Sequence, residues 1–90
     1  MPKKIAVLVR DRHAEALRMA VGLTIQGDAV DVFIMCQEID LEDPSIALNL
    51  EMLAEVGVRI ISHTSGSTFA VMSIEDIARK LVEYDSVIPY

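Results

Sequence analysis

The sequence is poor in the residues that mark disulfide-stabilised, secreted or membrane-inserted proteins. It has one cysteine, Cys36, and no tryptophan among its 90 residues, so no disulfide can form within the chain. Its first apolar run, Ile5–Val9, follows two lysines and ends at Arg10. This run is too short for the core of a signal peptide or for a membrane span. We therefore expect a cytoplasmic location and no membrane partner.

Basic residues are also few. Eight Lys and Arg stand against 14 Asp and Glu, which gives a formal net charge of −6 at pH 7. A protein that binds nucleic-acid phosphates or an anionic lipid surface carries a basic patch that neutralises them. The charge balance gives no such footprint, so we expect no nucleic-acid partner.

Apolar residues, in contrast, are plentiful. They make up 52% of the chain, and the mean hydropathy of +0.39 excludes an intrinsically disordered protein. The length fits a single domain over residues 1–90. Because a chain of this size buries only roughly 60–65% of its surface on folding, the remaining apolar side chains predict an oligomer in which other subunits cover them.

Apolar segments predict β-strands, and segments with apolar residues on one helical face predict α-helices between them. The expected strands are Ile5–Val9, Val30–Met35, Val58–Ser62 and Ser86–Tyr90, and the expected helices are about His13–Gln26, Pro44–Val56 and Ile74–Tyr84. Asp43 and Ser73 are expected N-caps, and Gly27 and Gly57 are expected helix ends. Pro89 makes the last strand an edge strand or a strand end.

Helical spacing also predicts which side chains face inward. It assigns Ile77, Leu81 and Val82 to the inward face of the last helix. Sequence does not separate the core from a subunit interface for Met19, Met52 and Phe69, and we expect all three in the core.

The alternation of strands and helices, with short connections, predicts right-handed crossovers and a parallel sheet with helices on both faces. Ligands of such sheets bind beyond the carboxyl ends of the strands. Three loops follow the first three strands, namely Arg10–His13, Cys36–Asp43 and His63–Ser73. They contain the only cysteine and both histidines, so the candidate site lies at this edge.

Cys36 is the strongest nucleophile that this edge offers. Four acidic residues follow it closely: Glu38, Asp40, Glu42 and Asp43. Their negative charge raises the pKa of a neighbouring thiol, whereas Arg10, Arg12 or His13 would compensate if the first two strands are adjacent. A buried, inert thiol and a reactive thiol therefore both stay open.

The histidines have two interpretations each. His63 is suited to act as a general base or to bind an anion together with the hydroxyls of Thr64 and Ser65, or else to bond backbone groups as a loop residue. His13 belongs to the first helical turn, where it can also orient a substrate anion with Arg12. The chain has no metal-ligand spacing and no glycine-rich phosphate loop, so we expect no metal and no cofactor.

Four stretches carry a resemblance to a known family: KIAVLVR at 4–10, EALRMAVGL at 15–23, GDAVDVFIM at 27–35 and LAEVGVRII at 53–61. In this pattern the chain resembles the DsrE/DsrF-like family of small sulfur-relay proteins. The resemblance implies a three-layer α/β/α, flavodoxin-like fold with an open, mostly parallel sheet of four to five strands. It also implies a homo-oligomer, trimer or hexamer, or a hetero-oligomer with related subunits.

Active members of that family pass sulfur as a persulfide on a cysteine just after the strand that corresponds to Val58–Ser62. Here no cysteine follows that strand, and Cys36, after the second strand, is the only thiol. Two functions lead, and a third, an α/β domain that binds a small anion through His63 and the Ser/Thr loop, ranks last because no motif supports it. In the first, Cys36 carries sulfane sulfur, and His63 or Arg10 and Arg12 stabilise the persulfide anion. In the second, the chain is a non-catalytic oligomeric accessory or small-ligand-binding module of the same fold.

Overall fold

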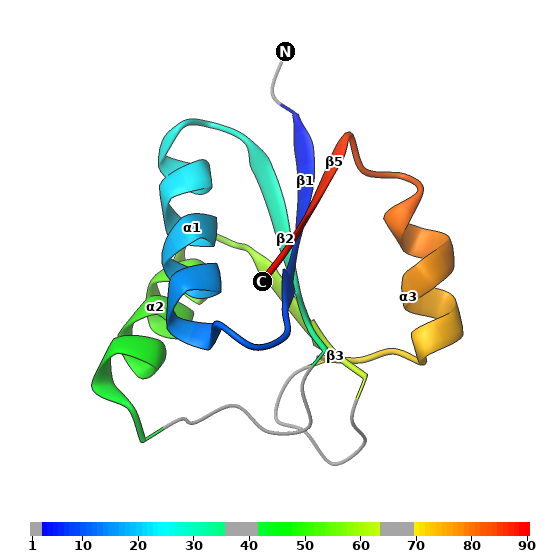
Figure 1. The fold of residues 1–90 in the computed structure, drawn as a ribbon. Helices are drawn as coiled ribbons and strands as arrows, with labels where there is room; N and C mark the ends of the chain where they lie inside the picture. Colours follow the sequence, from blue (N-terminus) through cyan, green and yellow to red (C-terminus); the bar gives the residue numbers. More distant parts are fainter. Residues whose placement is uncertain (1–2, 36–41, 64–69) are drawn as a thin grey trace.

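The computed structural model describes residues 3–35, 42–63 and 70–90 (Figure 1). The strands in these ranges are β1 (Lys4–Val9), β2 (Ala29–Ile34), β3 (Arg59–Ser62), β4 (Ala70–Val71) and β5 (Ser86–Pro89). The helices are α1 (His13–Ile25), α2 (Pro44–Glu55) and α3 (Ile74–Leu81). None of these helices has the length and apolar character that crossing a membrane requires.

All of these strands run parallel in one sheet, in the order β4-β3-β2-β1-β5. Figure 1 views the sheet edge-on, with α1 and α2 on its left face and α3 on its right face. The connections from β1 to β2 and from β2 to β3 each lead toward the β4 edge of the sheet. The connection from β4 to β5 leads back across the sheet to the opposite edge. Because such crossovers are right-handed, the reversal puts α3 on the opposite face. The predicted three-layer, flavodoxin-like α/β fold is confirmed.

Local capping signals confirm where α2 and α3 begin. The Asp43 carboxylate accepts a hydrogen bond from the Ser45 amide at 2.9 Å, and the Ser73 hydroxyl accepts one from the Asp76 amide at 3.1 Å. Gly27, after α1, has a φ of 92°, a left-handed conformation that glycine adopts without strain. These short-range signals fix the element boundaries that they mark.

Two segments differ from the prediction. β4 pairs with the end of β3, although the sequence indicated only a passage into the next helix. With two residues, β4 is too short to show any periodicity. α3 ends at Leu81 rather than Tyr84, because the chain turns there and brings the Tyr84 side chain under the helix, where it is buried.

The larger core cluster lies between the sheet and the α1/α2 layer. It consists of alternate residues of β1 and β2 with the inward residues of both helices: Ile5, Val7, Val9, Val30, Val32, Ile34, Ala16, Leu17, Ala20, Ile46, Leu50 and Leu53. The smaller cluster, under α3, contains Ala6, Phe33, Ile61, Ile77 and Tyr84. The rings of Phe33 and Tyr84 meet edge to face, with centroids 5.8 Å apart. The strand side chains thus alternate between two unequal cores.

Three burial predictions are wrong. Val82, assigned to the inward face of α3, is 84% exposed because the helix ends before it. Met19 and Met52, expected in the core, are 38% and 40% exposed, and Phe69, also expected there, lies outside the described residues. Met19 and Met52 lie outside the inward faces of α1 and α2. Those faces are already occupied by Ala16, Leu17 and Ala20 on α1 and by Ile46, Leu50 and Leu53 on α2.

Candidate functional site

The candidate site lies at the carboxyl edge of the sheet, where β1, β2 and β3 end side by side. The Met35 amide donates to the Val9 carbonyl at 2.9 Å, so the pairing of β2 with β1 continues one residue beyond the strands. On the other side, Nε2 of His63 lies 3.1 Å from the Met35 carbonyl oxygen and donates to it. The backbone of Met35 is therefore held between the end of β1 and the end of β3.

The loop between β1 and α1 supplies the positive charge at this edge. Arg10 and Arg12 are exposed, and His13 is the first residue of α1. His13 donates from Nε2 to the Arg10 carbonyl oxygen at 3.0 Å. Arg12 is the N-cap residue, and its guanidinium lies 3.7 Å from the Glu15 carboxylate. Exposed guanidinium groups next to a helix N-terminus favour anions over cations.

The end of β5 is hydrogen-bonded to the loop between β1 and α1. The amide of Tyr90 donates to the Leu8 carbonyl at 2.9 Å, and the Tyr90 carbonyl oxygen accepts from the amides of Asp11 and Arg12 at 2.9 and 2.8 Å. A groove of about 340 Å³ results, lined by Arg10, Asp11, Arg12, Pro89 and Tyr90. It lies between β1 and β5, where the connections change from one face of the sheet to the other. Open α/β sheets bind ligands at this switch point, and this groove presents the guanidinium groups of Arg10 and Arg12 together with the carboxylate of Asp11.

The structure brings together some of the predicted residues. Arg10 and Arg12 lie in the loop between β1 and α1 and His13 begins α1, whereas His63 stands at the end of β3, beyond β2. Cys36, Thr64 and Ser65 lie outside the described residues. Sequence analysis did not find Tyr90 as a lining residue, because its place beside Asp11 depends on β5 pairing with β1.

Within residues 3–35, 42–63 and 70–90, no three His, Cys, Asp or Glu side chains gather in a way that could hold a metal ion. The functional groups of the carboxyl edge, as described, are the guanidinium groups of Arg10 and Arg12, the imidazoles of His13 and His63, the Asp11 carboxylate and the Tyr90 phenol.

A second polar cluster lies at the opposite, amino edge of the sheet, under α3. Asp31 on β2 is 8% exposed. Its carboxylate accepts two hydrogen bonds from Arg59 on β3, at 2.9 Å from Nη2 and 3.4 Å from Nε, and a third from the hydroxyl of Tyr84. Lys4 Nζ lies 4.9 Å from the centre of the Tyr84 ring, a cation–π contact. The carboxylate is thus fully partnered.

Charge and burial act in opposite directions on this cluster. Burial raises the pKa of Asp31. The hydrogen bonds from Arg59 and Tyr84 and the positive charges of Arg59 and Lys80 lower it by more, so the pKa lies below its ordinary 3.8. Burial and the bond to Asp31 raise the pKa of Tyr84 far above its ordinary 10.0. At neutral pH the cluster therefore holds a carboxylate, a guanidinium and a neutral phenol.

The sequence pattern did not predict this cluster. Its one local signal is a carboxylate, Asp31, between Val30 and Val32 in an apolar strand, which requires buried partners. The partners are 28 and 53 positions away in the chain, so no local pattern identifies them.

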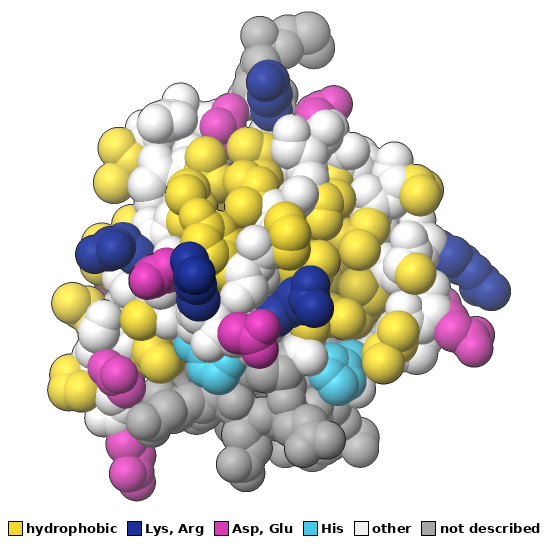
Figure 2. Space-filling model, viewed as in Figure 1, with side chains coloured by type: hydrophobic (Ala, Val, Ile, Leu, Met, Phe, Trp, Pro, Cys, Tyr) yellow, Lys and Arg dark blue, Asp and Glu magenta, His cyan; other side chains and the backbone are white. Residues whose placement is uncertain are grey.

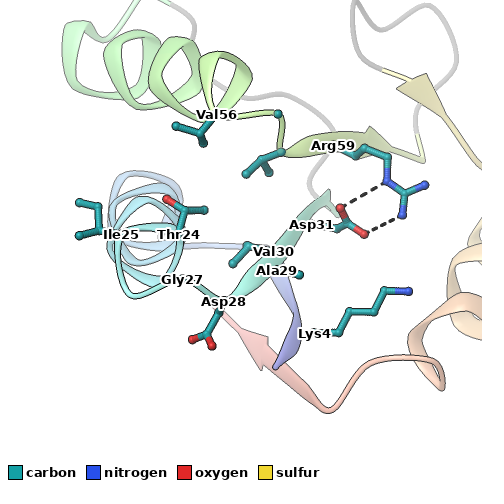
Figure 3. A pocket seen from close by; sticks show the side chains of 12 residues that line it. Lys4, Thr24, Ile25, Gly27, Asp28, Ala29, Val30, Asp31, Val56 and Arg59 are labelled. Carbon is teal, nitrogen blue, oxygen red and sulfur yellow. Dashed lines mark hydrogen bonds and ion pairs between the residues drawn. The ribbon is translucent and has the colours of Figure 1, made fainter. Parts of the chain in front are cut away.

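A second groove, of about 470 Å³, lies beside this cluster (Figure 3). It runs between the C-terminal ends of α1 and α2. Ile25 and Val56 border it, and the pair of Arg59 and Asp31 lies at one end. Because this is the amino edge of the parallel strands, the ligand-binding rule for open α/β sheets favours the smaller groove at the carboxyl edge.

Comparison of the chain with known protein families, with curated proteins and with solved structures finds no match. The DsrE-like assignment therefore stays a prediction.

Proposed function

We propose that this chain is a small DsrE-like protein of the sulfur-relay type that carries sulfane sulfur on Cys36. The proposal includes a cytoplasmic location and a homo-oligomer, trimer or hexamer, or a hetero-oligomer with related subunits. The alternative is an accessory or small-ligand-binding module of the same fold, which keeps the carboxyl-edge groove without the transfer chemistry.

One observation supports the proposal above the others. The backbone of Met35 lies between the end of β1, which leads into Arg10 and Arg12, and the imidazole of His63. Cys36 is the next residue in the sequence. Positive charge close to a thiol lowers its pKa and increases the fraction of nucleophilic thiolate. We therefore expect Arg10 and Arg12 to offset the effect of the acidic residues that follow Cys36 in the sequence.

The transfer step needs no external oxidant or reductant. The Cys36 thiolate attacks the outer sulfur of a donor persulfide, R–S–SH. A new S–S bond forms on Cys36 while the S–S bond of the donor breaks, and the donor leaves as the thiolate R–S⁻. The persulfide proton stays on the transferred sulfur and is then lost to solvent, because persulfides are more acidic than thiols. The resulting anion is the species that Arg10, Arg12 or His63 would stabilise.

The intact mass after exposure to a sulfane-sulfur donor tests the transfer directly. We expect the wild type to gain the mass of one sulfur atom and Cys36→Ser to gain none. The alkylation rate of Cys36 against pH should have its midpoint below the ~8.5 of an ordinary thiol. Arg10→Gln with Arg12→Gln should raise that midpoint, whereas Arg79→Gln, on α3, should leave it unchanged.

The opposite results select the alternative. A folded wild type with no gain in mass, and with an alkylation midpoint at or above that of a free thiol, would exclude sulfur transfer through Cys36. The chain would then be the accessory or ligand-binding module.

A further inference from the structure

The outer surface of the α1/α2 layer carries large apolar side chains that the fold of one chain does not bury. They are Met19 and Ile25 on α1, Leu48 and Met52 on α2, and Val56 directly after α2, each between 38% and 79% exposed. In Figure 2 apolar side chains project at the left margin, on the side of these helices. We call these five residues the outer patch.

The part of the outer patch on α2 is a continuous stripe. Leu48, Met52 and Val56 are four residues apart and therefore follow one another along the same side of the helix. The buried residues of α2, Ile46, Leu50 and Leu53, face the sheet on the other side. α2 is thus apolar on two faces, which is typical of a helix that has neighbours on both.

Gly22 lies in the middle of the exposed face of α1, three residues from both Met19 and Ile25. A glycine inside a helix is less favourable than alanine. Neither conformation nor packing within the described chain requires it: Gly22 has no positive φ, and a Cβ added there would meet no atom within 4 Å. A residue without a side chain at this position allows another backbone to approach α1 closely.

The outer patch supplies more than half of the area that one side of a standard interface needs. From the exposed fractions of its five side chains, it presents roughly 500 Å² of apolar surface, against about 800 Å² that each partner contributes to a standard interface. Charged side chains that surround the patch supply the remainder as a polar rim.

The charges around the outer patch are complementary between the two helices. α2 exposes Glu51 and Glu55 and has no basic residue, whereas α1 exposes Arg18 and, one turn before it, Glu15, whose carboxylate lies 3.7 Å from the Arg12 guanidinium. Within the described ranges, no ion pair involves Arg18, Glu51 or Glu55. A two-fold contact that lays α1 of one chain on α2 of another brings Arg18 of each copy to the glutamates of the other, twice by symmetry.

We propose that the outer patch is the contact surface for a second copy of this chain, related by a two-fold axis, with Gly22 at the closest approach of the helices. This proposal does not rest on the chemistry of Cys36. It names a surface and a symmetry for the oligomer, and it is compatible with a dimer or with a hexamer built from two-fold contacts.

Analytical ultracentrifugation of the Cys36→Ser chain tests it, since this variant excludes intermolecular disulfides and sulfur loading. We expect an even number of subunits. Leu48→Glu with Met52→Glu should raise the dissociation constant at least about 100-fold and give a folded monomer. Val82→Glu and Val87→Glu, at exposed apolar positions outside the patch, are the matched controls and should leave assembly unchanged.

Gly22→Ala gives the sharpest readout because its two effects have opposite signs. In the Leu48→Glu, Met52→Glu monomer it should raise the thermal midpoint, since alanine favours the helix. In the assembling chain it should weaken association about tenfold, since the new methyl group meets the partner helix.

Charge exchange provides a rescue. Arg18→Glu should weaken association, and adding Glu51→Arg with Glu55→Arg to the same chain should restore it. A wild type that stays monomeric or forms only a trimer would overturn the proposal. So would loss of assembly with Val87→Glu instead of the outer-patch variant, or tighter or unchanged association with Gly22→Ala.

Discussion

The two faces of the sheet are stabilised in different ways. The α1/α2 face buries aliphatic side chains from two helices, with no charged group among its buried residues. The α3 face has one short helix, and beside a small apolar cluster it holds Asp31 with Arg59 and Tyr84. Where one helix is too short to cover its face, a partnered carboxylate ties the turn after that helix to two strands. Apolar contact supplies stability on one face, and directional bonds supply part of it on the other.

Truncation of the aliphatic core should have the largest effect. Leu53→Ala removes a fully buried side chain between α2 and the sheet, and we expect the free energy of unfolding to fall by about 2–5 kcal/mol because of lost burial and the cavity left behind. Val82→Ala, at an exposed position beside α3, should change it by less than about 0.5 kcal/mol. Urea denaturation of both variants checks this difference, and equal losses would contradict the assignment of the core.

Neutralising the carboxylate of the α3 face should have an intermediate and pH-dependent effect. Asp31→Asn should lower the free energy of unfolding by about 2 kcal/mol at pH 7, since hydrogen bonds to a charged group are lost or weakened. The pKa of Asp31 is lowered in the folded protein, so its contribution is present above the unfolded pKa of about 3.9 and is lost as the pH falls through the folded pKa.

Denaturation at pH 7 and at successively lower pH values measures this dependence. The difference between wild type and Asp31→Asn should shrink below about pH 4. A difference that stays constant down to the lowest pH would show that Asp31 contributes through shape and not through its charge. Leu53→Ala is the matched control, because its effect has no reason to follow this titration.

Loss of a helix cap should have the smallest effect, and it should be similar on both faces. Asp43→Ala on α2 and Ser73→Ala on α3 each remove one hydrogen bond to a backbone amide of the first helical turn, at about 1 kcal/mol each. Thermal unfolding checks both variants. A much larger loss for Ser73→Ala would indicate that the single helix of the α3 face depends more on its cap than the helices of the opposite face do.

Much of the fold could be predicted from local sequence. Apolar runs located four of the strands, and Asp43, Ser73 and Gly27 marked helix boundaries because capping acts over three or four residues. β4 has two residues and no pattern. The end of α3 was placed too late because Tyr84 belongs by spacing to the helix but by contact to Asp31, which is distant in the sequence.

The candidate site was predictable only as a region. The rule that ligands bind at carboxyl ends selects the loops of Arg10 and His63 once a parallel sheet is expected. It does not give the neighbour of β1, so the groove with Tyr90 required the strand order. The exposure of Met19 and Met52 could not be predicted either. Helical periodicity is the same for an apolar face that packs on the sheet and for one that stays exposed on the single chain.

The place of β5 also determines when the sheet can be completed. β1 is made first, but its second neighbour comes from residues 86–89, some eighty positions later. During synthesis on a ribosome, β2 can pair with β1 and β3 with β2 as soon as each emerges. The other edge of β1 stays unpaired until almost the whole described chain has emerged. An apolar strand with an unpaired edge associates readily with other chains. The nascent chain is therefore most vulnerable to aggregation in the interval before β5 is available, and the arrival of β5 ends that interval with a strand whose proline lies at the new edge of the sheet.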